Sequence, residues 1–143
     1  MKRHTSTTDH TNHTNILPQL HLDATLLLDI FDEPIVIQRN FLSLTGSLNT
    51  AMLLSWIVTL SQDQSPESDG WLRLSQSTWQ SDTGLSRFEL ETTRAALRKQ
   101  GLIEERRKGM PAKIEIRLDV HRLGQALQEQ AQRRYAAVEM TGT

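Results

Sequence analysis

Basic side chains are concentrated in one part of this 143-residue chain, residues 86–117. That segment holds nine basic and five acidic residues (9 − 5 = +4), and because the net charge is −1 the remaining positions sum to −5. Association with a polyanion depends on the local field more than on the total charge. The chemistry that this segment predicts is therefore contact with phosphate groups and with base edges. The nine basic residues are Arg87, Arg94, Arg98, Lys99, Arg106, Arg107, Lys108, Lys113 and Arg117.

Catalytic and metal-binding patterns are not found in this sequence. It has no cysteine, no glycine-rich phosphate loop, no paired histidine ligands on a helix and no nucleophile beside a histidine base. His4, His10 and His13 lie in a polar tail, which offers a metal ion no fixed geometry. We therefore expect no enzyme activity, no cofactor and no metal site.

Two elements have to position the basic residues, a helix and a hairpin. Ser86 and Glu89 form a capping box that begins a helix, and Gly101 ends it after Gln100. Residues 102–107 and 113–118 are predicted strands, joined by a turn over residues 108–112. A helix beside a basic hairpin suits the major groove of DNA and the backbone next to it.

A step of 100° per residue divides the predicted helix into three faces. The buried face holds Leu90, Thr93, Leu97 and Ser86. The flanking face holds Arg87, Arg94 and Arg98 with Glu91 among them, and the outward face holds Phe88, Thr92, Ala95 and Lys99. Arginine can bind guanine bidentately, and threonine can contact a thymine methyl group. The alternative is a solvated face in which Glu91 pairs with Arg87 and Arg94. We expect Phe88 to fold back onto the preceding helix.

The hairpin favours DNA over that alternative, because four basic residues crowd around one turn and folding does not require such repulsion. The predicted DNA-binding residues are Ser86, Arg87, Glu91, Thr92, Arg94, Ala95, Arg98, Lys99, Arg106, Arg107, Lys108 and Lys113.

The rest of the chain predicts a domain around these two elements. Residues 1–15 form a disordered polar tail, 16–40 an extension with short strands at 26–30 and 35–38, 41–118 the main domain, and 119–143 a C-terminal helix and tail. Further helices are expected at 48–61 and 76–82, and a short strand at 71–74. The fold class is thus α+β and mainly helical, a winged helix-turn-helix with a small antiparallel sheet.

Several segments resemble a known family. Thr83-Gly-Leu-Ser-Arg87, the run from Ala95 to Lys113, the run from Phe41 to Ser55, and Gly70-Trp71 are similar to winged helix-turn-helix proteins of bacterial phages and plasmids. This group includes replication initiators and replisome organisers, and multiple-antibiotic-resistance-type repressors are more distantly similar.

The resemblance covers roughly residues 34–123. It implies that helix 86–100 enters the major groove of double-stranded DNA while hairpin 106–113 grips the flanking backbone, in replication initiation or transcriptional regulation. The chain departs from the group in its acidic total and in the acidic loop 62–69.

Partners other than DNA are also predicted. The stripe Val120, Leu123, Leu127 and Ala131 suggests a homodimer that sets two recognition helices about one DNA turn, ~34 Å, apart; alternatively, this helix packs on its own domain. The rival function is a protein–protein adaptor, with the acidic loop and the C-terminal helix as surfaces for a replication or transcription protein. The sequence has no secretory signal and no apolar run long enough for a bilayer, so we expect a cytoplasmic protein without a membrane partner.

Overall fold

The computed structural model describes residues 23–26 and 34–142. The chain divides into two units, residues 1–33 and Pro34–Thr143, and the fold described below is that of the second. The predicted tail, residues 1–15, lies outside the described residues. So do residues 27–30 of the first predicted strand, whereas residues 24–26 form a helical turn.

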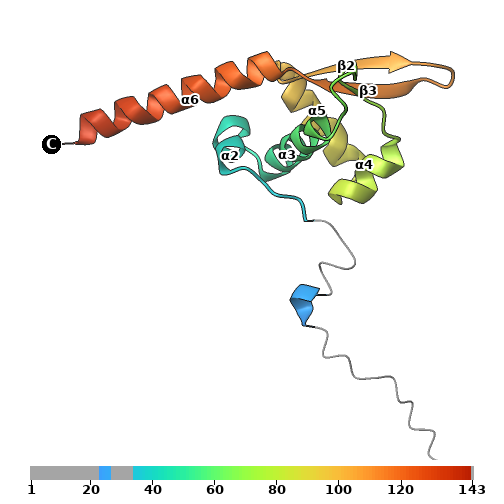
Figure 1. The fold of residues 1–143 in the computed structure, drawn as a ribbon, viewed down its shortest axis with the longest axis horizontal. Coiled ribbons are helices and arrows are strands. Elements are labelled where there is room, and N and C mark those ends of the chain that lie inside the picture. Colours follow the sequence, from blue (N-terminus) through green and yellow to red (C-terminus); the bar gives the residue numbers. More distant parts are fainter. Residues whose placement is uncertain (1–22, 27–33, 143) are drawn as a thin grey trace, which may run out of the picture. The chain divides into compact units, whose positions relative to one another are not determined.

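The second unit is a mixed α+β fold in which helices predominate, with one small antiparallel sheet (Figure 1). Its three strands lie in the order β1-β3-β2, so β3 is central. This is the predicted helix-turn-helix followed by a hairpin. In chain order the elements are α2 (Arg39–Thr45), α3 (Leu48–Gln62), β1 (Trp71–Leu72), α4 (Gln76–Thr83), α5 (Arg87–Lys99), β2 (Ile103–Lys108), β3 (Lys113–Leu118) and α6 (Val120–Thr141).

The core lies where α3 packs against α5 and against the inner face of the sheet. Leu97 of α5 and Ile116 of β3 are fully buried against the apolar side of α3. The other large side chains without exposed surface are Leu53, Leu54, Ile57 and Leu102. Packing of the apolar face of α5 into the core fixes the rotation of this helix about its axis. That rotation decides which residues of α5 can contact a partner.

The turn from α4 to α5 is built as the sequence predicts. Gly84 has a φ of 70°, in the left-handed region that favours glycine. The Ser86 hydroxyl accepts a hydrogen bond from the Glu89 N–H, and the Glu89 carboxylate accepts one from the Ser86 N–H, which completes the capping box. Gly101, with a φ of 71°, follows the end of α5.

The strand predicted at residues 35–38 is wrong, because residues 34–38 precede α2 without joining the sheet. The Gln38 N–H donates to Ser55 Oγ at 3.2 Å, and Ile37 packs against the core. Contact with α3 therefore replaces the strand pairing that the β-branched residues suggested.

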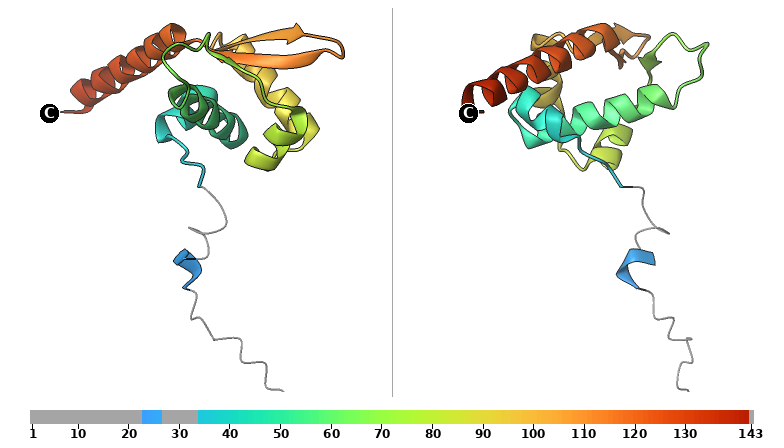
Figure 2. Two further views of the ribbon diagram at one scale, coloured as in Figure 1. Left: turned by 45° about the vertical axis from the view of Figure 1, so that its right-hand side comes forward. Right: turned by 60° about the vertical axis from the view of Figure 1, so that its left-hand side comes forward.

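The C-terminal helix extends past the rest of the unit, and the β2–β3 hairpin projects in a different direction (Figures 1 and 2). Leu123 and Ala126 of α6 are buried, whereas residues 131–141 are all exposed. Among the residues that the structure describes, no helix is both long and apolar enough to span a membrane.

Candidate nucleic-acid interface

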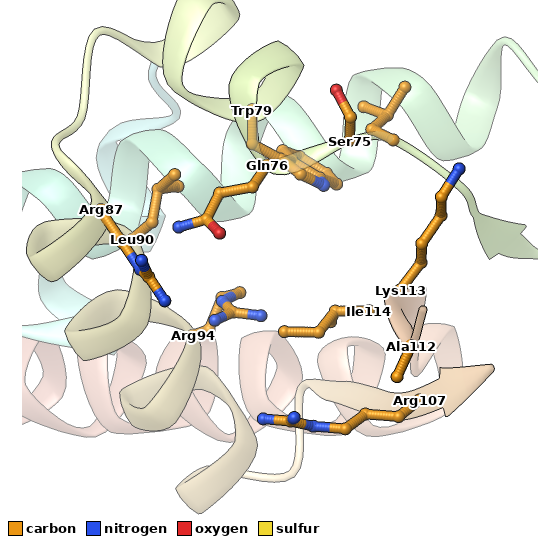
Figure 3. A pocket seen from close by; sticks show the side chains of 11 residues that line it. Ser75, Gln76, Trp79, Arg87, Leu90, Arg94, Arg107, Ala112, Lys113 and Ile114 are labelled. Carbon is orange, nitrogen blue, oxygen red and sulfur yellow. The ribbon is translucent and has the colours of Figure 1, made fainter. Parts of the chain in front are cut away.

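A hollow of about 330 Å³ lies between α5, the beginning of α4 and the β2–β3 hairpin (Figure 3). Its lining combines apolar side chains with four basic ones, so it suits a ligand that carries negative charge. The lining residues are Leu74, Ser75, Gln76, Trp79, Arg87, Leu90, Arg94, Arg107, Ala112, Lys113 and Ile114.

The basic side chains of the hollow come from α5 and from the β2–β3 hairpin that follows it in the chain. Arg87 and Arg94 extend from α5, Arg107 extends from β2, and Lys113 extends from the hairpin (Figure 3). Successive side chains of a strand point to opposite faces, so Arg107 shares its face of β2 with the buried Ile103. That alternation turns Arg107 toward α5.

Glu105 lies on the same face of β2 and binds two arginines of α5. Arg94 Nη1 donates to Glu105 Oε1 at 2.7 Å, and Arg98 Nη1 donates to Glu105 Oε2. The Glu105 side chain is only 10% exposed, so water screens these contacts weakly. The alternative, in which Glu91 pairs with Arg87 and Arg94, is not what the structure has, since neither arginine lies within ion-pair distance of Glu91. Glu91 lies one helical turn from both arginines, but strand β2 brings a carboxylate closer to Arg94.

The surroundings of Arg94 are electrostatically crowded. Partial burial lowers the pKa of its guanidinium from the usual value, and the charges of Arg98 and Arg107 lower the pKa further, although Glu91 opposes them. An arginine keeps its proton at neutral pH nonetheless. The carboxylate of Glu105 offsets part of this crowding, but Arg107 has no ion pair of its own among the described residues, so the hollow still favours an anion.

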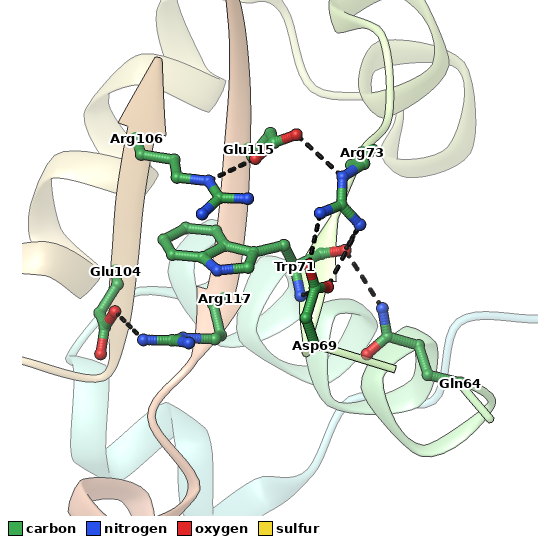
Figure 4. A network of polar contacts seen from close by, with 8 residues as sticks. All are labelled: Gln64, Asp69, Trp71, Arg73, Glu104, Arg106, Glu115 and Arg117. Carbon is green, nitrogen blue, oxygen red and sulfur yellow. Dashed lines mark hydrogen bonds and ion pairs between the residues drawn. The ribbon is translucent and has the colours of Figure 1, made fainter. Parts of the chain in front are cut away.

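Arg106 does not belong to this surface, contrary to its place among the predicted DNA-binding residues. It lies on the outer face of the sheet, pairs with the buried carboxylate of Glu115, and stacks on Trp71 with its guanidinium 4.0 Å from the ring centroid. Arg117 lies 4.7 Å from the same centroid, and the indole sits between the two guanidinium groups (Figure 4). Folding thus accounts for Arg106 without a phosphate partner.

The network around Trp71 continues to the loop before β1 (Figure 4). Arg73 binds Glu115 at 2.9 Å and Asp69 at 2.6 Å. The hydrogen bond from Arg106 is the main reason why the pKa of Glu115 is lowered, and the hydrogen bond from Arg73 is the main reason why the pKa of Asp69 falls to about 2. These ion pairs hold β1 and the hairpin together.

Five of the predicted DNA-binding cations make no ion pair among the described residues. Arg87, at the start of α5, and Lys99, at its end, are both exposed. The other three surround the tip of the hairpin, where Gly109 has a φ of 90°. They are Arg107, Lys108 and Lys113, and all are exposed.

The outward face of α5 is open to solvent. Phe88 does not fold back onto α4 and is 77% exposed, because it lies on the side of α5 opposite the buried Leu90. Thr92 and Ala95 are exposed beside it, as is Glu91 on the neighbouring line. Ser86 is exposed too, but its hydroxyl serves as the helix cap.

The predicted dimerisation stripe of α6 is divided between two surroundings. Leu123 is buried in the core of its own domain and Leu127 packs against that core, whereas Val120 and Ala131 are exposed. A stripe that includes Leu123 is therefore not free to pair with a second copy. Exposed apolar side chains lie farther along the helix, at Tyr135 and Val138.

Three residues of this region carry roles that sequence reasoning missed: Trp71, Glu105 and Glu115. The alternation of β2 could have revealed one of them, because burial of Ile103 places Glu105 on the face that meets the helix. Comparison of the chain with protein-family models, curated proteins and solved structures found no match.

Proposed function

We propose that this protein binds double-stranded DNA, with α5 in the major groove and the β2–β3 hairpin on the flanking backbone. It would be a cytoplasmic protein that acts in replication initiation or transcriptional regulation of a mobile element such as a phage or plasmid. The observation that carries the proposal is the group of cations without ion-pair partners around the hollow, on α5 and at the hairpin tip.

Two physical arguments support DNA as the polyanion. The major groove is wide enough for an α-helix, and the outward face of α5 is exposed along its length at Phe88, Thr92, Ala95 and Lys99. The hairpin cations lie to one side of this helix, where a phosphate backbone borders the groove. Nothing in the core needs these cations, in contrast to Arg106, so their cost in mutual repulsion favours an external anion.

The experiment is fluorescence anisotropy with a labelled duplex of about 20 base pairs over a series of salt concentrations. Changing Arg107, Lys108 and Lys113 together to alanine should weaken binding and lower the log–log salt slope by about 2.7, since each phosphate contact contributes about 0.9. A control that removes the same charge from Arg39, Arg133 and Arg134, away from the hairpin, should leave the slope nearly unchanged. Equal effects of the two triple variants would contradict the proposed surface.

A protein–protein adaptor is the second candidate, and the exposed end of α6 favours it. Tyr135 and Val138 are 74% and 65% exposed and continue the line of Leu127 and Ala131 beyond the domain. Such a stripe fits a partner helix, either from another protein or from a second copy of this chain. No binding of wild-type protein to any duplex at low salt would favour the adaptor.

Replication and transcription would use the same contact surface. Mapping the bound DNA in the native host separates them, because an initiator should occupy iterated sites at an origin and a regulator should overlap a promoter. The same map would show the spacing of half-sites if the protein binds as a homodimer.

A further inference from the structure

The outward face of α5 differs in chemistry from its flank. Phe88, Thr92 and Ala95 lie within about 60° of one another at 100° per residue, opposite the buried Leu90. All three are exposed, and each presents methyl or aromatic carbon to solvent. A single exposed apolar side chain is ordinary, but here three follow one line along the helix, and charged residues flank them.

Two of the three arginines on the flank of α5 are held by Glu105, and the third, Arg87, lies at the start of the helix. Bidentate recognition of guanine requires both donors of a free guanidinium. Arg94 and Arg98 each engage one Nη1 with an oxygen of Glu105; the Arg94 side chain is 15% exposed and the Arg98 side chain 47%. Turning either side chain into a groove would leave a nearly buried carboxylate with one partner fewer.

We propose that α5 recognises thymine, through contact of Phe88, Thr92 and Ala95 with the C5-methyl groups in the major groove. This inference rests on the proposed function, since it names the bases that the same helix reads. Thymine is the natural base that presents a methyl group in the major groove, and alanine, threonine and phenylalanine are side chains that contact it. Unpaired cations at both ends of the line, Arg87 and Lys99, suit the phosphates that border the groove.

The test compares thymine with uracil, which lacks only the methyl group. High-affinity duplexes are first selected from a random-sequence pool, and the best is then synthesised with deoxyuridine in place of thymidine. We expect thymine enrichment in the selected sites and a loss of about fourfold in affinity for each contacted methyl group. The salt slope should stay the same, because the phosphate contacts are unchanged.

Two variants separate contact with the methyl groups from contact with the phosphates. Phe88→Ala should shrink the ratio of thymine to uracil affinity and leave the salt slope unaltered. Its thermal unfolding should match the wild type, since the ring is exposed. Arg107→Ala should lower the salt slope by about 0.9 and preserve the thymine-to-uracil ratio.

Equal affinity for the thymine and uracil duplexes would overturn this inference while leaving DNA binding intact. A guanine-rich selected site, or an unchanged ratio in Phe88→Ala, would overturn it as well. Absence of binding to every duplex at low salt would overturn the proposed function and the inference together.

Discussion

Replacement of Glu105 by glutamine should loosen α5 from the hairpin and raise nonspecific DNA affinity. The change keeps the size of the side chain but removes the charge that holds Arg94 and Arg98. A hydrogen bond to a charged group contributes about 1.5–3 kcal/mol, and glutamine retains one acceptor, so we expect the free energy of unfolding to fall by about 2 kcal/mol. Urea unfolding followed by tryptophan fluorescence measures this directly.

Glu104→Gln is the matched control, because it removes the same charge from the neighbouring position of the same strand. Glu104 faces the other side of β2 and pairs with Arg117 at 2.6 Å, and the two side chains are 47% and 40% exposed. An exposed ion pair of this kind is worth below about 1 kcal/mol. Equal destabilisation by the two variants would refute the view that burial strengthens the Glu105 contacts.

The DNA-binding consequence follows from the two released guanidinium groups. If each gains one phosphate contact, the slope of log affinity against log salt concentration steepens by about 1.8. If the variant and the wild type bind equally at 1 M salt, the variant then binds up to about 60-fold more tightly at 0.1 M salt. A single new contact gives about eightfold. The added affinity should be sequence-independent, so the discrimination between selected and random duplexes should narrow. Anisotropy over the salt series would refute the reasoning if Glu105→Gln leaves the slope unchanged.

Three further changes test the core, the outer network and the end of α6. Leu97→Ala should lower the free energy of unfolding by about 2–5 kcal/mol, because Leu97 is fully buried; a loss below about 1 kcal/mol in urea unfolding would contradict its place in the core. Since the folded-state pKa of Asp69 is about 2, below the ordinary 3.8, its contribution to stability is present above pH 4 and is lost as the pH falls toward 2. Asp69→Asn should therefore reduce the loss of stability over that range, and an unchanged pH profile would count against the Arg73 contact. If α6 pairs with a second copy, light scattering should detect a dimer that Tyr135→Ser with Val138→Ser converts to a monomer, whereas a monomeric wild type would exclude the dimer.

Local signals in the sequence were sufficient for most of the elements. The capping box at Ser86 and the glycine after Gln100 depend on neighbours within a few positions, and both have the predicted form. Residues 113–118 form the predicted strand, but their burial does not alternate as predicted, because Glu115 is buried beside Ile116 in the central strand. The predicted strand at 35–38 was wrong because its conformation depends on a distant segment. Its β-branched residues favour a strand, but the choice between sheet and helix surface depended on α3, which lies farther along the chain.

The number of basic residues in a segment does not show which of them are free to bind an anion. Arg106 and Arg107 are adjacent and look alike in the sequence, yet one stacks on Trp71 and the other lines the hollow. Strand alternation separates them, but the partners come from distant segments. Glu91 is the acid that lies near the arginines of α5 in the sequence, but Glu105 of β2 forms the ion pairs with Arg94 and Arg98.

The sequence by itself thus determined the order of helices and strands, the buried face of α5 and the concentration of cations between residues 86 and 117. Only the tertiary structure decided which of those cations are neutralised, because an ion pair forms where two elements meet and not where two residues are close in the chain. Packing of β2 against α5 brought Glu105 to Arg94 and Arg98, and left Phe88, Thr92 and Ala95 open on the outward face.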